Sequence, residues 1–550
     1  MERHGRRTVH AMTTLVRSVG TIGALTAISR VFGFVRDMLL ARVLGAGLAA
    51  DAWQLAFTLA NTFRRLFAEG AFSVAFVPMY TRKLAAGPES GGGEAGADAF
   101  AGDVLSVFVW VLLGFSALCM IAMPGIVWLL AREYQSVPGK FELSVVLARV
   151  TFPYLGLVSL VAMLSGVLNA RSRFGPGAFV PVLLNIVMIG GIVAGAWIRG
   201  SAGDDIIVAW ALAISLAIAG AVQLLYMVLA TRRAGVRLKI TLPRFTPEVK
   251  RLGLLILPAT FGAGIYQISQ LVDTFFATSL PQGSLTLLKM ADRLNQMPLG
   301  IFGIALGTAI LPMLARHIQS GDAREAQRLQ ANAIEIAMLL CLPSAVALAI
   351  CAEAFTTGIF QGGRMTLEDT RVMGAIVMAL VAGLPAYVLI KVFQPAFFSR
   401  EDMRTPVWIA AGALTANIAL NFHVVPRYGI VGLAAATAIT AWLNVASLYT
   451  VLQLRGWFTM TGRLAGRIAR QIAATAVMAG LLALMAPRME AMWSGGTLPR
   501  IGALVALVLA GGAAFFAAAF LFGALDKSLL AQLRRRRPVS TTEGPPNLSE

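Results

Sequence analysis

Long apolar runs, separated by short polar segments, follow one another from one end of the chain to the other. Many exceed twenty residues, the helix length that crosses about 30 Å of hydrocarbon. The pattern predicts an all-α polytopic membrane protein with about fourteen transmembrane helices. Their predicted starts lie near Ser18, Ala49, Val104, Leu143, Ala178, Ile206, Arg251, Ser284, Asn332, Val372, Pro406, Ile430, Ile468 and Ile501.

Composition supports the membrane interpretation. Hydrophobic residues make up 57% of the 550 residues and charged residues only 13%, whereas about a quarter of a soluble domain is charged. The net charge of +19 agrees with cytoplasmic loops rich in Lys and Arg, and we predict no nucleic-acid partner. With the N-terminus placed in the cytoplasm, most Lys and Arg outside the spans fall on that side. Both termini are therefore predicted to be cytoplasmic.

The chain repeats itself in two halves. AFVPMYTR at 75–82 resembles AILPMLAR at 309–316, and two further matches follow in the same order. An even number of spans per half makes the two halves parallel, an arrangement that transporters use with the substrate bound between them. The predicted division is a cytoplasmic N-terminal segment (1–17), a first six-helix lobe (18–233), a cytoplasmic linker (234–250), a second six-helix lobe (251–455), two additional helices (456–526) and a basic, then disordered, cytoplasmic tail (527–550).

Charged residues interrupt the first two predicted helices. The stretch SRVFGFVRD at 29–37 holds two arginines and an aspartate, each costing about 2.5–3.5 kcal/mol at the bilayer centre on insertion scales. Arg30 and Asp37 are seven positions apart and share a helical face, with Gly33 between them to admit a neighbour. Asn61 and Arg64, three positions apart, also share a face.

The arginines outnumber the acids on these two helices, which predicts a positively charged cavity. A buried cation without compensation is costly, and the planar arginine fork matches phosphate oxygens bidentately. The competing interpretation is a set of structural salt bridges with Asp37, Asp51 and Glu69. We favour a phosphate-bearing substrate as the partner of Arg30, Arg36, Arg64 and Arg293.

A second polar group lies in the other half. Asp273, Asn417, Asn421 and Thr437 offer oxygen ligands that suit a hard cation such as sodium. Polar contacts between helices are the alternative, which we favour. No Walker A, HExxH or GxSxG sequence is present, and the three cysteines have no metal-binding spacing. The sequence therefore predicts a protein that moves molecules, is not an enzyme and carries no cofactor or firm metal site.

One long run identifies a family. SRVFGFVRDMLLARVLGAGLAADAWQLAFTLANTFRRLFAEGAFSVAFVPMY closely resembles the N-terminal signature of the MurJ (MviN) family, the bacterial lipid II flippases of the MOP exporter superfamily. TFPY at 151–154, ADRL at 291–294 and SREDMRTP at 399–406 are similar to further family motifs. The resemblance covers most of the first twelve helices, and the last two match the family's fourteen-helix plan.

The resemblance implies a function. Family members carry lipid II, the undecaprenyl-diphosphate-linked muropeptide, from the inner to the outer leaflet of the bacterial plasma (inner) membrane for peptidoglycan synthesis. For this chain we expect alternating access between the two halves, driven by the membrane potential directly or through coupled Na⁺ or H⁺. The last two helices would form a hydrophobic groove, and the implied partners are lipid II, membrane lipids and cell-wall synthesis or division proteins. The family's cavity residues fall on Arg30, Arg36, Arg64 and Arg293, with Asp37, Asp51 and Asn61 as polar neighbours.

Three other functions stay open from the residues alone. A flippase for another polyprenyl-diphosphate-linked oligosaccharide would need the same cationic cavity. A cation-coupled multidrug exporter would need an acidic or aromatic pocket, against which the surplus of arginines argues. A membrane scaffold without transport predicts fully paired charges. One departure from some relatives is Gln296, which stands where they carry a glutamate after ADRL.

Overall fold

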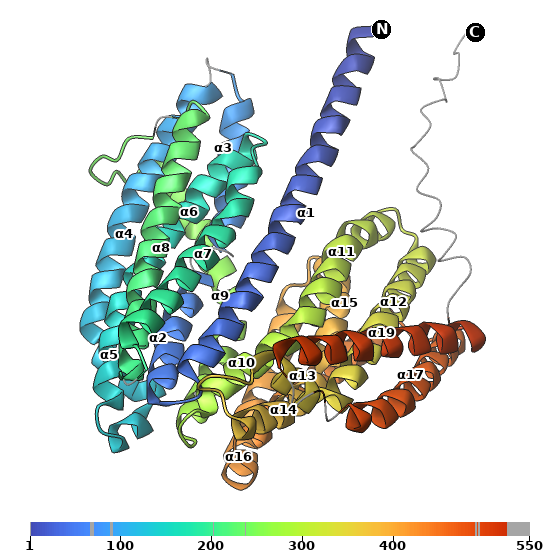
Figure 1. Cartoon of the computed structure of the whole chain (residues 1–550). Helices are drawn as coiled ribbons and strands as arrows, with labels where there is room; N and C mark the ends of the chain where they lie inside the picture. Colours follow the sequence, from blue (N-terminus) through green and yellow to red (C-terminus); the bar gives the residue numbers. More distant parts are fainter. Residues whose placement is uncertain are drawn as a thin grey trace, which may run out of the picture. The chain divides into compact units, whose positions relative to one another are not determined.

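The structure is a computed structural model that describes residues 2–524 except 66–70, 88–91, 202, 237, 490–491 and 493–495. The described residues form helices joined by short turns (Figure 1), and their single bridge pairs Gly362 with Met365. The all-α prediction is confirmed. The predicted tail, 527–550, and Glu69 lie outside the described residues.

The chain divides into two compact units. The first comprises Met1–Met297, Phe355–Gly383 and Asp402–Asn444. Its helices are α1 (Glu2–Leu44), α2 (Leu48–Arg64), α3 (Ala71–Ala85), α4 (Gly93–Leu130), α5 (Lys140–Thr151), α6 (Pro153–Ala170), α7 (Gly175–Arg199), α8 (Asp205–Arg233), α9 (Pro247–Thr278), α10 (Ser284–Pro298), most of α13 (Ala352–Phe360), α14 (Leu367–Val381) and most of α16 (Arg404–Leu454).

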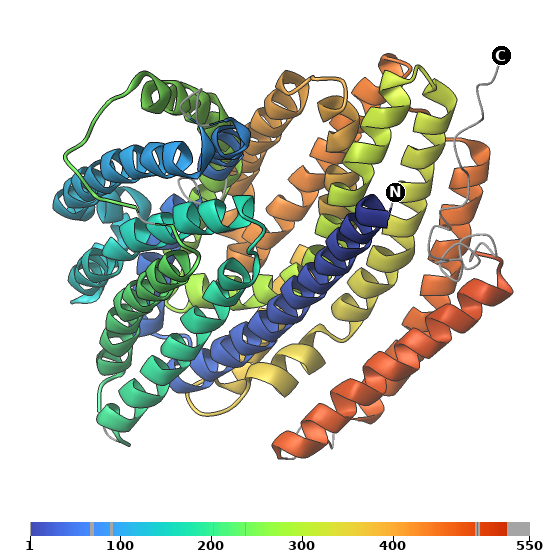
Figure 2. The same cartoon turned by 90° about the horizontal axis from the view of Figure 1, so that it is seen from above.

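The second unit comprises Pro298–Ala354, Leu384–Glu401 and Val445–Glu550. Within it α12 packs against α15 and α17, and α17 packs against α19 (Figures 1 and 2). The predicted division into two six-helix lobes remains a prediction. The helices of this unit are α11 (Ile304–Gln319), α12 (Ala323–Ile350), α15 (Leu384–Phe398), α17 (Gly462–Arg488) and α19 (Thr497–Leu521).

Local sequence explains where several helices begin. The Thr246 hydroxyl accepts from the Val249 N–H, and the next residue, Pro247, suits the first turn of α9. Thr366 and Asp369 form a reciprocal capping box at the start of α14. Gly429, with φ of 57°, interrupts α16 at the point where the sequence predicts a new helix near Ile430.

All fourteen predicted starts fall inside helices. Nine stretches of the described residues are long and apolar enough to span a membrane. Two predicted helices are divided: α5 ends at Thr151 and α6 begins at Pro153, and the π-helical turn Leu299–Gly303 joins α10 to α11. The second predicted helix contains α2 and α3, and residues 66–70 between them lie outside the described residues. The repeated prolines, Pro78 and Pro312, both lie inside helices.

Packing within the first unit fixes the elements that carry the charges. The helix α1 runs along α7, α7 runs along α8, and α2 packs on α5 (Figure 1). Stacked aromatic rings join α3 to α4, with Phe72 and Phe108 at a centroid distance of 4.7 Å. Each helix buries one apolar side in this bundle, so the remaining polar positions of α1 and α2 have fixed neighbours.

Candidate functional site

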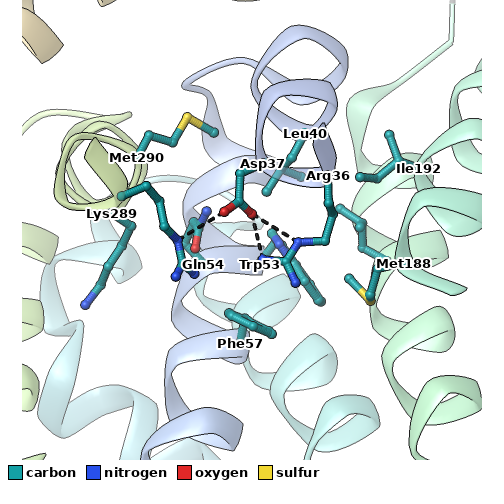
Figure 3. A pocket seen from close by; sticks show the side chains of 12 residues that line it. Arg36, Asp37, Leu40, Trp53, Gln54, Phe57, Met188, Ile192, Lys289 and Met290 are labelled. Atoms are coloured by element: carbon teal, nitrogen blue, oxygen red, sulfur yellow. Dashed lines mark hydrogen bonds and ion pairs between the residues drawn. The ribbon is translucent and has the colours of Figure 1, made fainter. Parts of the chain in front are cut away.

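The candidate site is built around the carboxylate of Asp37 on α1. Its Oδ1 accepts hydrogen bonds from Arg36 Nε and Nη2 at 3.0 and 2.7 Å. Its Oδ2 lies 3.2 Å from Nε of Arg293 on α10. Figure 3 shows the Asp37 carboxylate beside the Arg36 guanidinium, with dashed lines for its ion pairs and hydrogen bonds. Arg36 and Arg293 come from different halves of the sequence, and the Asp37 carboxylate contacts both of them.

The Arg36 guanidinium is held by a third group that sequence reasoning missed. Its Nη1 donates to Oδ1 of Asn185 on α7 at 3.0 Å, and Asn185 Nδ2 donates to the Ser29 carbonyl at 3.0 Å. Gly33 faces this amide, and a Cβ built there would lie 3.5 Å from Asn185 Nδ2. The glycine predicted to admit a neighbour thus admits Asn185, which ties Arg36 to the α1 backbone.

These charges line an open pocket within the first unit, which we call the cationic pocket. Its empty volume, including the open mouth, is about 430 Å³. Among its lining residues Arg36, Lys289 and Arg293 are cations and Asp37 is the one anion, so its formal charge is positive (Figure 3). Trp53, Phe57 and Met188 form part of its apolar wall. Such a pocket can bind a phosphate group through guanidinium forks.

The other predicted arginines lie outside this pocket. Arg30 is exposed on α1, two turns before Asp37. Arg64 is partly buried near the end of α2 and donates from Nε to Asn61 Oδ1 at 2.9 Å, so the predicted shared face is confirmed. The structure therefore brings Arg36, Asp37 and Arg293 together and leaves Arg30, Asn61 and Arg64 as separate polar positions of the first unit.

Asp51 differs from the prediction that it borders the substrate. Its carboxylate is buried and lies 2.8 Å from Lys140 Nζ. It also accepts from the Gly283 N–H, and from both the N–H and the hydroxyl of Thr286. With its acceptor sites occupied, this carboxylate stabilises the start of α10 instead of facing the cationic pocket, and we correct its assignment to a structural one.

Lys140 completes this buried group. Its Nζ lies 4.0 Å from the ring centroid of Tyr134, in the turn between α4 and α5. Burial raises the pKa of the Tyr134 phenol well above its ordinary value, and the Asp51 carboxylate acts in the same direction. No local sequence pattern marks Lys140 as a partner of Asp51, because the two residues are 89 positions apart.

The proposed cation ligands form two contacting pairs in the first unit. Thr437 Oγ1 is 3.5 Å from Asp273 Oδ1, and Asn421 Nδ2 donates to Asn417 Oδ1 at 3.0 Å. Asn417 in turn donates to Thr440 at 3.3 Å. The Oδ1 of Asn421 is buried and has no hydrogen-bond partner in the described part of the chain. Carboxylate, amide and hydroxyl oxygens with one orphaned acceptor fit a hard cation.

Comparisons with known proteins agree with one another. A family model described as "Lipid II flippase MurJ" matches residues 40–504. A probable lipid II flippase MurJ of Rhizobium tropici is 38% identical over 534 residues, covering 96% of this chain and 98% of the relative. Its counterpart in Rhizobium meliloti (strain 1021) is 39% identical over the same length and coverage.

Solved structures show the same fold. A structure titled "Lipid II flippase MurJ, inward closed conformation" has a TM-score of 0.74 at 22% identity, covering 91% of this chain and 98% of its own. An inward-facing multidrug resistance MATE transporter of the MOP superfamily has a TM-score of 0.65 at 13% identity, covering 79% and 97%. At these identities the likeness concerns the fold alone.

Proposed function

The chain belongs to the MurJ family of lipid II flippases, and we propose that it moves lipid II from the inner to the outer leaflet of the plasma membrane. The observation that supports this function best is the cationic pocket, whose lining holds three cations and one carboxylate, that of Asp37, which contacts Arg36 and Arg293. The diphosphate group of the transported lipid would bind in this pocket and balance its surplus positive charge. Lipid II is the substrate, and the reaction moves it without covalent change.

In the proposed mechanism the guanidinium forks of Arg36 and Arg293 bind the diphosphate. Lys289 adds a third positive charge to the same pocket, and Asn185 keeps Arg36 oriented. Arg30 and Arg64 provide further positive charge on α1 and α2 along the path of the head group. Asp37 bridges the two forks until the substrate displaces it.

Movement follows alternating access between the two sequence halves. An inside-negative membrane potential acts on the positive pocket, at about 2.3 kcal/mol per charge per 100 mV. Sodium or proton coupling is the other route for the driving force, and Asp273, Asn417, Asn421 and Thr437 would hold a sodium ion. The polyprenyl tail stays in lipid, along the groove formed by α17 and α19.

The proposed location is the bacterial inner membrane, with both termini in the cytoplasm. The excess of Lys and Arg in the segments assigned to that side supports this orientation. Cell-wall synthesis or division proteins are the proposed partners, because the product is released where the wall is built. The multidrug alternative is disfavoured, because a pocket with three cations repels organic cations.

Depletion and rescue tests the proposal. Arg30→Ala and Arg293→Ala variants, produced at native levels, should fail to support wall synthesis when the native protein is depleted. Arg328→Ala, on the exposed start of α12, is the matched control and should rescue fully. If cells that carry Arg293→Ala grow and synthesise wall at native levels, the proposal that Arg36 and Arg293 bind the diphosphate is wrong. Purified protein in vesicles, supplied with different polyprenyl-linked sugars, then distinguishes lipid II from related substrates.

A further inference from the structure

Part of the segment that joins α8 to α9 lies against α4 without regular secondary structure. We call residues 238–245 the linker segment; it passes beside α4 in both views (Figures 1 and 2). The Thr241 N–H donates to Ser106 Oγ at 2.9 Å. A Cβ built on Gly102 would lie 3.4 Å from the Lys239 carbonyl oxygen. Two contacts therefore fix the segment at one level of α4.

The sequence of α4 gives the depth of that level. Asp103 is the last charged residue of the helix, and the chain is predominantly apolar, with no charged residue, from Val104 to Leu130. This stretch belongs to a helix long and apolar enough to span a membrane. Ser106 stands one turn inside the apolar stretch, so the linker segment crosses α4 where hydrocarbon gives way to head groups.

The linker segment turns one side chain towards the protein and leaves its neighbours exposed. Leu238 packs against the buried core between α3 and α4, and the Thr241 N–H bonds to Ser106. Ile240 and Leu242 are 64% and 77% exposed. Phe245, beyond Pro243, is 62% exposed. Three large apolar side chains therefore stand free of the protein at the depth of the membrane interface.

Two basic residues accompany them. Lys239 and Arg244 are both exposed, and the linker segment contains no acidic residue. Apolar side chains combined with Lys and Arg are the composition of interfacial anchors, which bury the former below the head groups and pair the latter with anionic lipids. This complementarity favours the lipid surface over a protein partner.

We propose that the linker segment is an interfacial anchor in the cytoplasmic leaflet of the membrane. Ile240, Leu242 and Phe245 enter the hydrocarbon, and Lys239 and Arg244 bind anionic head groups. The anchor fixes the connection between the two sequence halves to the membrane surface. This inference goes beyond lipid II transport, and its test does not depend on transport.

Spin labels can measure the depth directly. The three buried cysteines are first replaced (Cys119→Ala, Cys341→Ala and Cys351→Ala), and single cysteines are introduced as Ile240→Cys, Leu242→Cys or Phe245→Cys. Ser320→Cys, in the polar turn after α11, is the aqueous control, and Leu509→Cys, on the exposed apolar face of α19, is the hydrocarbon control. Each variant is placed in nanodiscs and must keep the native elution volume and unfolding temperature.

We expect the ratio of oxygen to nickel-chelate accessibility at positions 240, 242 and 245 to be several-fold above that at 320 and close to that at 509. Nickel accessibility equal to that at 320 would overturn the proposal, because the segment would then lie in water. Labels shielded from both reagents would also overturn it, because a second copy or another protein surface would then cover the segment.

Lipid composition tests the head-group contact. Raising the share of anionic lipid in the nanodiscs should lower nickel accessibility at Ile240→Cys. Lys239→Gln combined with Arg244→Gln should remove that dependence while the label keeps its oxygen accessibility. If anionic lipid lowers nickel accessibility equally with and without Lys239→Gln and Arg244→Gln, these two residues do not pair with anionic head groups.

Discussion

Asp37 binds Arg36 through one carboxylate oxygen and Arg293 through the other, at 2.7 and 3.2 Å. The two guanidinium groups belong to different halves of the sequence and occupy one carboxylate between them. Arg36 donates to Asp37 through Nε and Nη2, whereas Arg293 contacts it through Nε. Binding of a diphosphate must replace the carboxylate, so Asp37 and the substrate compete for the same donors.

The competition predicts opposite effects on binding and on turnover. Asp37→Asn removes the competing charge, so a lipid-linked diphosphate should bind about tenfold more tightly, the equivalent of about 1.4 kcal/mol. Release should become slower and the flipping rate should fall. Titration in detergent measures the dissociation constant, and vesicles measure the rate. Asp37→Glu, which keeps the charge, is the control, and weaker binding by Asp37→Asn would refute the competition.

Asn185 should affect binding through the orientation of Arg36. Asn185→Ala leaves one guanidinium nitrogen of Arg36 without its partner, which costs about 1–3 kcal/mol. The dissociation constant for the diphosphate should therefore rise at least fivefold, while the pocket keeps its charge. Asn169→Ala, at the exposed end of α6, is the matched control and should bind as the native protein does. If Asn185→Ala binds the diphosphate as tightly as the native protein does, Asn185 does not contribute to diphosphate binding through Arg36.

Periodicity and charge were sufficient to predict much of this arrangement. Spacing along a helix placed Asn61 and Arg64 on one face, and hydropathy located helices at every predicted start. Both signals are local, since they depend on residues within one or two turns. Charge already included Arg293 before the family resemblance was considered, although no local pattern links position 293 to position 37.

Contacts between distant segments could not be predicted. The family resemblance assigned Asp51 to the cleft, whereas its partner Lys140 is 89 positions away and could not be inferred from local sequence. Asn185 lies 149 positions from Arg36 within an otherwise apolar helix. Which buried charges meet depends on how the helices pack, and that packing is a property of the whole fold rather than of any local pattern.

The Asp51 group should contribute strongly to stability. Asp51→Asn leaves Lys140 as an uncompensated buried cation, which should cost about 3–5 kcal/mol in the free energy of unfolding. Thermal unfolding in detergent measures the loss. Combining Asp51→Asn with Lys140→Met removes the stranded charge and should recover part of the stability. A double variant that is less stable than Asp51→Asn alone would contradict this assignment.

Sodium should stabilise the protein if the oxygen cluster around Asn421 binds it. We expect the unfolding temperature to be higher in sodium chloride than in choline chloride at equal ionic strength, because a ligand that binds the folded state adds RT ln(1 + [L]/Kd) to its stability. Asp273→Asn should abolish the difference. Equal unfolding temperatures in the two salts would leave only the alternative, hydrogen bonding between helices.

Glu335 and Arg467 fix α17 to α12 within the second unit. Arg467 Nη1 lies 2.6 Å from a carboxylate oxygen of Glu335, and the two side chains are 18% and 4% exposed. Gln471, one turn further along α17, donates to the Glu335 carbonyl at 3.2 Å. Glu335→Gln should therefore lower the free energy of unfolding by about 3–5 kcal/mol, because it strands a guanidinium inside the bundle.

The matched control is an exposed pair on the same helix. Glu325 and Arg328 lie 3.7 Å apart and are 44% and 73% exposed, so Glu325→Gln should change the stability by no more than about 1 kcal/mol. The reversed pair, Glu335→Arg with Arg467→Glu, restores opposite charges and should recover stability that neither single variant has.

Because α17 carries one wall of the proposed tail groove, Glu335→Gln should also slow flipping, and the reversed pair should restore the rate. If the reversed pair recovers stability but not the flipping rate, the ion pair stabilises the protein without affecting the groove. If it recovers neither, the pair needs its native orientation.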